Sequence, residues 1–201
     1  MTARPRQPKR KPTAKIEQPA VVSSSPPSSV LVERLQAYAR QPVVRWAVVV
    51  LVLAFFAVHG MIAARRNTPT PDEFAYVPEG YYHLRTHDLS FDTTNPPLLK
   101  MIMALPLLAM DLQLDTDPRW RDNTKGWGPW IFGTRFMRLN QARYLDAFFA
   151  ARLVILAIGV GLGVVVFRHA AALLSPLGAL VVMVLYGTTP TLKRSIVSRV
   201  P

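Results

Sequence analysis

Hydrophobic residues in this chain are gathered in long blocks rather than alternating with polar ones. The first block, Trp46–Ala64, contains no charged residue and is flanked by Arg45 and by Arg65-Arg66. At 1.5 Å per residue it reaches about 28 Å, close to the hydrocarbon thickness of a bilayer. Two further apolar blocks cover 147–167 and about 177–192. The pattern therefore predicts three transmembrane helices, at about 46–64, 147–167 and 177–192.

The segments between these blocks complete the predicted architecture. The second and third blocks are joined by a short link with a Ser175-Pro176 turn signal, which predicts an antiparallel hairpin. Residues 65–146 form a long loop, and its apolar segment 98–110 is too short to span a bilayer. That segment suits an interfacial or re-entrant helix. We therefore expect an all-α polytopic membrane protein with about three transmembrane helices and a large outside loop containing an interfacial, jaw-like helix.

Composition and charge locate the polar residues. The chain of 201 residues is 50% hydrophobic yet has a net charge of +12. Residues 1–42 are rich in Pro, Ser, Lys and Arg, and predict a disordered basic cytoplasmic tail. Because the excess of basic residues is concentrated in this tail, while acidic residues nearly balance the basic ones of the long loop, a nucleic-acid partner is not expected. The absence of Cys excludes disulfides and Cys-ligated metal sites.

The bias of Lys and Arg predicts the orientation. The basic tail belongs in the cytoplasm, so the loop 65–146 would lie on the outer side of the cell (inner) membrane. A third span would then place Lys193, Arg194 and Arg199 outside, against the same rule. Residues 193–201 are therefore an atypical C-terminal end, and we expect the chain to be a truncated or frameshifted fragment.

The long loop carries the candidate chemistry. Asp72 and Glu73 follow Thr70-Pro71 and are typical of a helix start, where carboxylates favour the positive end of the helix dipole. A carboxylate just above the bilayer could instead serve as a general base or a metal ligand. The sequence shows no compact His/Asp cluster, so a divalent metal stays open and no cofactor is certain.

Other loop residues have two interpretations each. The aromatic residues Tyr76, Tyr81 and Tyr82 are typical of a membrane-interface belt, but they could also stack on a sugar. Lys100 could extend its amine to the headgroups, or it could bind a lipid phosphate. A rigid break at Asn95-Pro96-Pro97 precedes it.

Taken in order, these pieces resemble a known family. The chain carries D-E-F-x-Y-x-P-x-G-Y-Y at 72–82, N-P-P-L-L-K at 95–100, A-L-P-L-L at 104–108 and A-R at 151–152. This set resembles the N-terminal portion of the C-type membrane glycosyltransferases, in the protein-mannosyltransferase and aminoarabinose-transferase-like branch. Those enzymes are multi-pass proteins that move a sugar from a polyprenyl-phosphate carrier to an acceptor on the outer face of the membrane.

The resemblance implies a role for each matching position. Asp72 would be the catalytic carboxylate, with Glu73 beside it. The family often has His or Lys before the paired prolines, near the lipid phosphate, and this chain has Asn95 there. Lys100 and Arg152 would then be the remaining phosphate partners.

The resemblance also fixes the functional expectation and its alternative. We expect a membrane glycosyltransferase that uses a polyprenyl-phosphate sugar donor, with membrane lipid as a further partner and an acceptor glycan, lipid or protein that the sequence does not identify. Members of the family usually have many more spans and a C-terminal domain. A non-catalytic three-span fragment or accessory protein is therefore the alternative.

Overall fold

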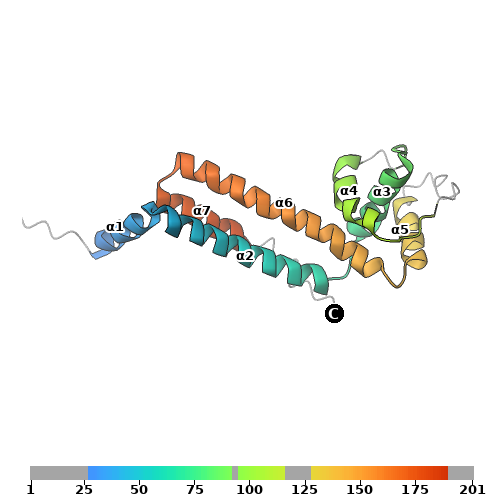
Figure 1. Cartoon of the computed structure of the whole chain (residues 1–201), viewed down its shortest axis with the longest axis horizontal. Coiled ribbons are helices and arrows are strands. Elements are labelled where there is room, and N and C mark those ends of the chain that lie inside the picture. Colours follow the sequence, from blue (N-terminus) through green and yellow to red (C-terminus); the bar gives the residue numbers. More distant parts are fainter. Residues whose placement is uncertain (1–26, 92–94, 116–127, 190–201) are drawn as a thin grey trace, which may run out of the picture.

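The computed structural model describes residues 27–91, 95–115 and 128–189, and those residues form helices and no strand. In chain order the elements are α1 (Pro27–Arg40), α2 (Pro42–Arg66), α3 (Pro71–Thr86), α4 (Pro97–Ala104), the 3-10 helix η1 (Leu105–Ala109), α5 (Gly128–Leu139), α6 (Tyr144–Leu173) and α7 (Pro176–Thr188). Figure 1 shows an elongated molecule in which α2, α6 and α7 lie side by side, while α3, α4 and α5 gather at one end. We call the first group the bundle and the second group, with η1, the cap.

The bundle is held by a narrow apolar seam. Helix α6 runs antiparallel to both α2 and α7 (Figure 1). Val49 and Leu53 of α2 pack with Phe167 of α6 and Met183 of α7. Gly163 lets these helices approach closely, since a Cβ there would lie 2.6 Å from a Leu53 methyl carbon.

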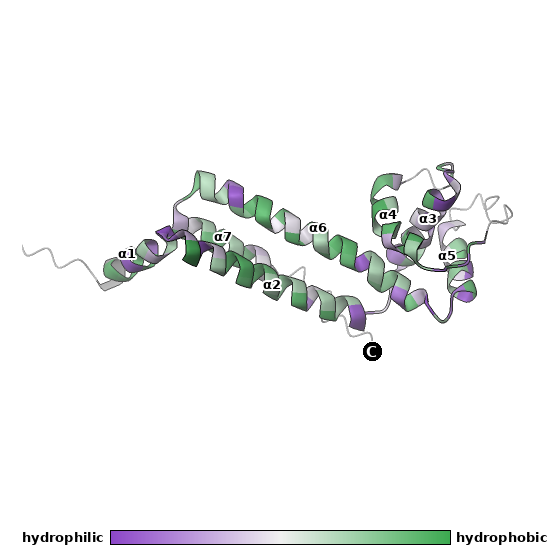
Figure 2. Cartoon of the chain, viewed as in Figure 1, coloured by the Kyte–Doolittle hydropathy of each residue, from purple (hydrophilic) through white to green (hydrophobic). Residues whose placement is uncertain are grey.

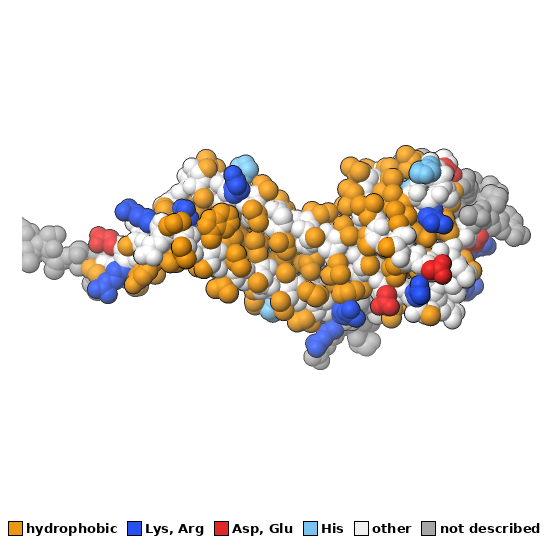
Figure 3. All heavy atoms as spheres, viewed as in Figure 1, with side chains coloured by type: hydrophobic (Ala, Val, Ile, Leu, Met, Phe, Trp, Pro, Cys, Tyr) orange, Lys and Arg blue, Asp and Glu red, His pale blue; other side chains and the backbone are white. Residues whose placement is uncertain are grey.

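Most side chains of the bundle face outward and are apolar. Helices α2 and α6 have 25 and 30 residues, and both are long and apolar enough to cross a membrane. In the apolar 18-residue stretch of each helix, only 17% in α2 and 11% in α6 is buried within the chain, whereas the core helix of a soluble domain is mostly buried. Hydrophobic residues predominate along α2, α6 and α7 in Figure 2, and hydrophobic side chains cover most of the face of the bundle that Figure 3 shows.

The helix bounds differ from the predicted spans. Helix α2 contains the predicted span 46–64, whereas α6 runs several residues beyond 147–167 at both ends. Helix α7 has 13 residues and begins at Pro176 after a Ser175 cap, as the turn signal predicted. Residues 190–192 of the predicted third span, and all of 193–201, lie outside the described residues.

Two segments are more ordered than the sequence predicted. Residues 1–42 were expected to be disordered, but Pro27–Arg40 forms helix α1, which lies against α2 and α7 and buries Ala39; residues 1–26 lie outside the described residues. No helix was predicted after the apolar segment 98–110 of the long loop, but Gly128–Leu139 forms helix α5. Phe132 and Phe136 bury one face of α5 in the cap, which explains the helix.

The cap has its own apolar core, next to the start of α6. Val77 and Tyr81 of α3 pack with Leu107 of η1, Phe136 of α5 and Phe148 of α6. The first turns of α6 thus belong to the cap, and the rest of α6 belongs to the bundle. This shared helix connects the candidate chemistry of the cap to the apolar surface of the bundle.

Candidate functional site

Helix α3 begins with a capping box that positions the two acidic residues. The Glu73 backbone N–H donates to Thr70 Oγ1 at 3.3 Å, and the Thr70 N–H donates to Glu73 Oε2 at 2.9 Å. Pro71 occupies the first helical turn, where a missing N–H costs nothing. The predicted helix start at Thr70 is confirmed. Asp72 lies on the same turn and is exposed.

Arg152 of α6 joins the start of α3 to the end of α2. Its guanidinium donates to both carboxylate oxygens of Glu73, from Nε at 2.9 Å and from Nη2 at 2.7 Å. It also donates to the backbone carbonyls of Ala64, Asn67 and Thr68, at 2.8–2.9 Å. Five hydrogen bonds match the five N–H donors of a guanidinium. Arg152 is therefore fully used in holding the chain between the bundle and the cap.

These contacts also set the charge state of Glu73. Burial of the carboxyl opposes ionisation, but the hydrogen bonds from Arg152 and Thr70 and the Arg152 charge outweigh it, so the pKa of Glu73 is lowered below 4.5. Glu73 is thus an anion with both oxygens engaged. Asp72 keeps the exposed carboxylate of the pair.

A second polar cluster is buried between α3 and α4. Lys100 Nζ donates to Glu79 Oε1 at 2.8 Å, and the two residues are 4% and 0% exposed. His83 Nε2 lies 3.4 Å from the same Glu79 oxygen, and His83 Nδ1 lies 2.7 Å from the Asp88 carbonyl oxygen. Burial of charge is costly unless it is paired. The cluster therefore ties the cap together.

Gly80 allows the two helices to approach closely enough for this pairing. A Cβ at Gly80 would overlap the Lys100 carbonyl oxygen. On the outer side of the cluster, Lys100 Nζ stands 4.8 Å from the Tyr76 ring centroid. Asn95 Nδ2 donates to the Tyr76 hydroxyl at 3.1 Å. The structure thus brings together Tyr76, Asn95 and Lys100, three of the predicted binding residues.

The other two predicted tyrosines lie inside the cap. Tyr81 is buried, and its hydroxyl donates to the Leu112 carbonyl at 3.2 Å. Tyr82 is buried against Phe91 and Phe132, and its hydroxyl donates to Asp88 Oδ2 at 2.9 Å. These positions give both residues a packing role. Their stacking on a sugar, the alternative to a membrane-interface belt, stays a prediction.

The candidate residues therefore form two groups along α3. Asp72, Glu73 and Arg152 lie at the start of α3, and Tyr76, Asn95 and Lys100 lie one to two turns further along. Within the described residues, no group of three or more His, Asp or Glu could hold a metal ion.

The sequence reasoning missed Glu79 and His83. Tyr76, Glu79 and His83 are spaced i, i+3 and i+7, so they share one face of a helix. That spacing was the available signal. It could not identify Lys100 as the partner, because the contact joins residues 21 positions apart through tertiary packing. Comparison of the chain with protein-family models, curated proteins and solved structures gives no match.

Proposed function

We propose that this protein is embedded in the cell (inner) membrane through α2 and α6. Their lengths correspond to about 38 Å and 45 Å at 1.5 Å per residue, enough to cross a bilayer with some tilt. The N-terminus would be cytoplasmic and the cap would lie on the outer side. The outward-facing apolar side chains of both helices support this embedding.

Helix α7 would complete a three-span unit. Its 13 described residues correspond to about 20 Å, less than a bilayer, and it packs along both α2 and α6. The third span is thus proposed as an extension of α7 into residues that the structure does not describe.

The α4–η1 segment would be the jaw-like helix at the outer surface. Lys100, Ala104 and Leu107 face the cap interior and are buried. The leucines on the opposite side are exposed: Leu98, Leu99, Leu105 and Leu108. A short helix that buries its charge and exposes leucine suits the interface between water and lipid.

We further propose that the cap contributes the catalytic carboxylate of a membrane glycosyltransferase with a polyprenyl-phosphate sugar donor. The observation that carries this proposal is the difference between the two carboxylates at the start of α3. Glu73 is held by hydrogen bonds from Arg152, whereas Asp72 is exposed at the end of the cap next to the bundle. Asp72 would accept the proton of the acceptor hydroxyl as the new glycosidic bond forms. The bond between the anomeric carbon and the phosphate oxygen would break, and the polyprenyl phosphate would leave with the electron pair.

The proposal changes the roles of two cations. Arg152 has its donors engaged by Glu73 and three carbonyls, so it acts as a positioning residue. Lys100 is paired with Glu79 but also faces Tyr76 and Asn95. A donor phosphate would therefore have to compete with Glu79 for the Lys100 amine.

A transfer assay with one matched control tests the proposal. The purified chain in lipid vesicles is incubated with radiolabelled polyprenyl-phosphate mannose, glucose and aminoarabinose, with a membrane extract as acceptor. Release of label into acceptor is expected for one donor, with a loss of at least about 100-fold in Asp72→Asn, as for removal of a general base. Asp111→Asn, another exposed Asp of the cap, should keep wild-type activity. No transfer by the wild-type chain, or equal transfer by both variants, would overturn the catalytic proposal.

A non-catalytic membrane protein is the second candidate. It is favoured by the pairing of both predicted phosphate partners, Arg152 and Lys100, with buried or partly buried carboxylates. In that case the cap would be a folded outer domain that supports a partner protein. The same assay decides between the two, since this candidate predicts no transfer from any of the three donors.

A further inference from the structure

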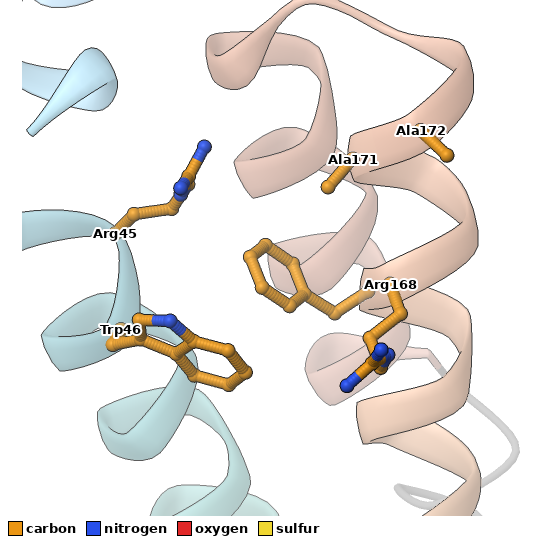
Figure 4. Close-up of a pocket in the computed structure, with 6 residues that line it drawn as sticks. Arg45, Trp46, Arg168, Ala171 and Ala172 are labelled. Atoms are coloured by element: carbon orange, nitrogen blue, oxygen red, sulfur yellow. The ribbon is translucent and has the colours of Figure 1, made fainter. Parts of the chain in front are cut away.

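A hollow lies at the end of the bundle opposite the cap, between α2 and α6. Its volume is about 360 Å³, and it is lined by Arg45 and Trp46 of α2 and by Phe167, Arg168, Ala171 and Ala172 of α6. In Figure 4 the arginines enter from the two different helices, on either side of the aromatic rings. The hollow is remote from the candidate catalytic residues of the cap.

The two arginines of this hollow differ from Arg152 and Arg135 at the cap end. Arg152 is paired with Glu73, and Arg135 with Asp115. Among the described residues, neither Arg45 nor Arg168 has a carboxylate partner, and the buried Nε of Arg45 has no hydrogen-bond acceptor. A buried donor without an acceptor costs about 1–3 kcal/mol. An anionic ligand that supplied oxygens here would recover that cost.

The walls of the hollow indicate which kind of anion fits. The Trp46 and Phe167 rings meet edge to face, with centroids 5.2 Å apart. Ala171 and Ala172 leave space beside the rings because their side chains are small. A tryptophan with flanking arginines is typical of the level of the lipid headgroups. Cations above an apolar wall match a molecule with a phosphate next to an acyl chain.

We propose that this hollow binds an anionic glycerophospholipid, with its anionic headgroup contacting Arg45 and Arg168 and its acyl chain along Phe167 and Ala171. Under the proposed orientation this end faces the cytoplasmic leaflet, where basic pockets between transmembrane helices bind anionic headgroups. The inference rests on the proposed membrane embedding of α2 and α6, and it is independent of sugar transfer. The bound lipid would fix α2 against α6 at the end that the cap does not reach.

Native mass spectrometry of the full chain tests the site. The protein is reconstituted in nanodiscs of phosphatidylglycerol and phosphatidylcholine in equal amounts, released into neutral detergent, and weighed with its retained lipid. We expect phosphatidylglycerol to be retained in preference to phosphatidylcholine. The double variant Arg45→Gln/Arg168→Gln should lose this preference by about tenfold or more, since each basic residue near an anionic surface contributes about a factor of five. The control, Arg65→Gln/Arg66→Gln at the other end of α2, should retain it.

Three results would overturn the proposal. They are equal retention of the two lipids by the unmodified chain, an unchanged preference in the Arg45/Arg168 double variant, and displacement of the lipid by inorganic phosphate, which would identify free phosphate as the ligand. The comparison of the two lipids needs no variant, so it decides the question even if the double variant fails to fold. Asp72→Asn, measured alongside, should keep its lipid. Loss of sugar transfer with retained lipid would therefore separate this site from the proposed catalytic one.

Discussion

The bundle and the cap arrange their side chains in opposite ways. In the bundle the interior seam is narrow, and large apolar residues such as Leu51 and Ile158 face outward. In the cap the aromatic residues are inside, and the buried Glu79–Lys100 pair is inside with them. This difference indicates that the two regions of the chain are adapted to different surroundings. The exposed apolar surface of the bundle suits an apolar surrounding, whereas the cap has the buried core of a small folded domain with part of its surface apolar.

Arg152 lies at the boundary between the two regions. It reaches from α6 to the end of α2 and to the start of α3. A flexible link at this point would let the cap rotate on the bundle. Five hydrogen bonds from a planar guanidinium fix the angle instead, which keeps Asp72 at a constant height above the apolar surface.

The largest expected effect comes from removing one partner of the buried ion pair in the cap. Glu79→Leu removes the carboxylate that neutralises Lys100, leaving a buried charge without its 2.8 Å partner. We expect the opening free energy of α3 to fall by about 3–5 kcal/mol. Hydrogen exchange of the α3 amides, measured by mass spectrometry in detergent, gives this value, and the α6 amides serve as an internal reference.

A double variant gives the control for that measurement. Glu79→Leu/Lys100→Met replaces both charges with apolar side chains of similar size, and should recover most of the lost protection. A double variant that exchanges as fast as Glu79→Leu alone would show that the ion pair is not what holds α3 to α4.

The second prediction compares two exposed apolar residues directly. Ile158 in the middle of α6 is 47% exposed, and Leu89 after α3 is 50% exposed. Ile158→Lys should lower the free energy of unfolding from lipid vesicles by about 3 kcal/mol, because lysine is disfavoured at the centre of a bilayer. Leu89→Lys, facing water, should change it by less than about 0.5 kcal/mol. Similar effects for the two variants would contradict the separation into lipid-facing and water-facing regions.

The third prediction concerns packing in the two regions. Gly80→Ala in the cap places a Cβ against the Lys100 carbonyl. It should lower the free energy of unfolding, measured by thermal unfolding, by about 1–3 kcal/mol. Gly161→Ala in the bundle meets nothing within 4 Å, so it should be neutral or stabilise α6 by up to about 1 kcal/mol. If both variants unfold alike, the close contact of α3 with α4 is not required.

The sequence predicted the bundle better than the cap, for a physical reason. A membrane-spanning helix is encoded by local composition, so the uncharged run 46–64 with its flanking arginines was enough to place α2. The Thr70 cap of α3 is equally local. Helix α5 depends on packing within the cap, where Phe132 lies in one apolar cluster with Tyr82 and Phe91.

The candidate site shows the same difference between features encoded locally and features that depend on tertiary packing. The acidic pair at 72–73 and its place at a helix start were readable from neighbouring residues. The engagement of Arg152 by Glu73 joins residues 79 positions apart, and that of Lys100 by Glu79 joins residues 21 apart. Neither contact has a periodic signal. A cation alone in a sequence could equally bind phosphate or a buried carboxylate, and only the fold distinguishes the two.

The smallest expected effect is the pH dependence of the contact between Glu73 and Arg152, which joins the cap to the bundle. Because the fold lowers the pKa of Glu73, its ionised form adds stability above 4.5, the ordinary value, and this stability is lost as the pH falls through the folded pKa. At neutral pH, Glu73→Gln should therefore unfold at a lower temperature, with a free energy of unfolding about 1 kcal/mol below that of the wild-type chain. On acidification, its free energy of unfolding should fall less than that of the wild-type chain. Thermal unfolding followed by circular dichroism at a series of pH values below neutrality measures both. Asp72→Asn, on the same helical turn, leaves the Arg152 contacts in place and is the matched control. Wild-type and Glu73→Gln curves that stay parallel over the acidic range would show that the Arg152 contact does not depend on the Glu73 charge.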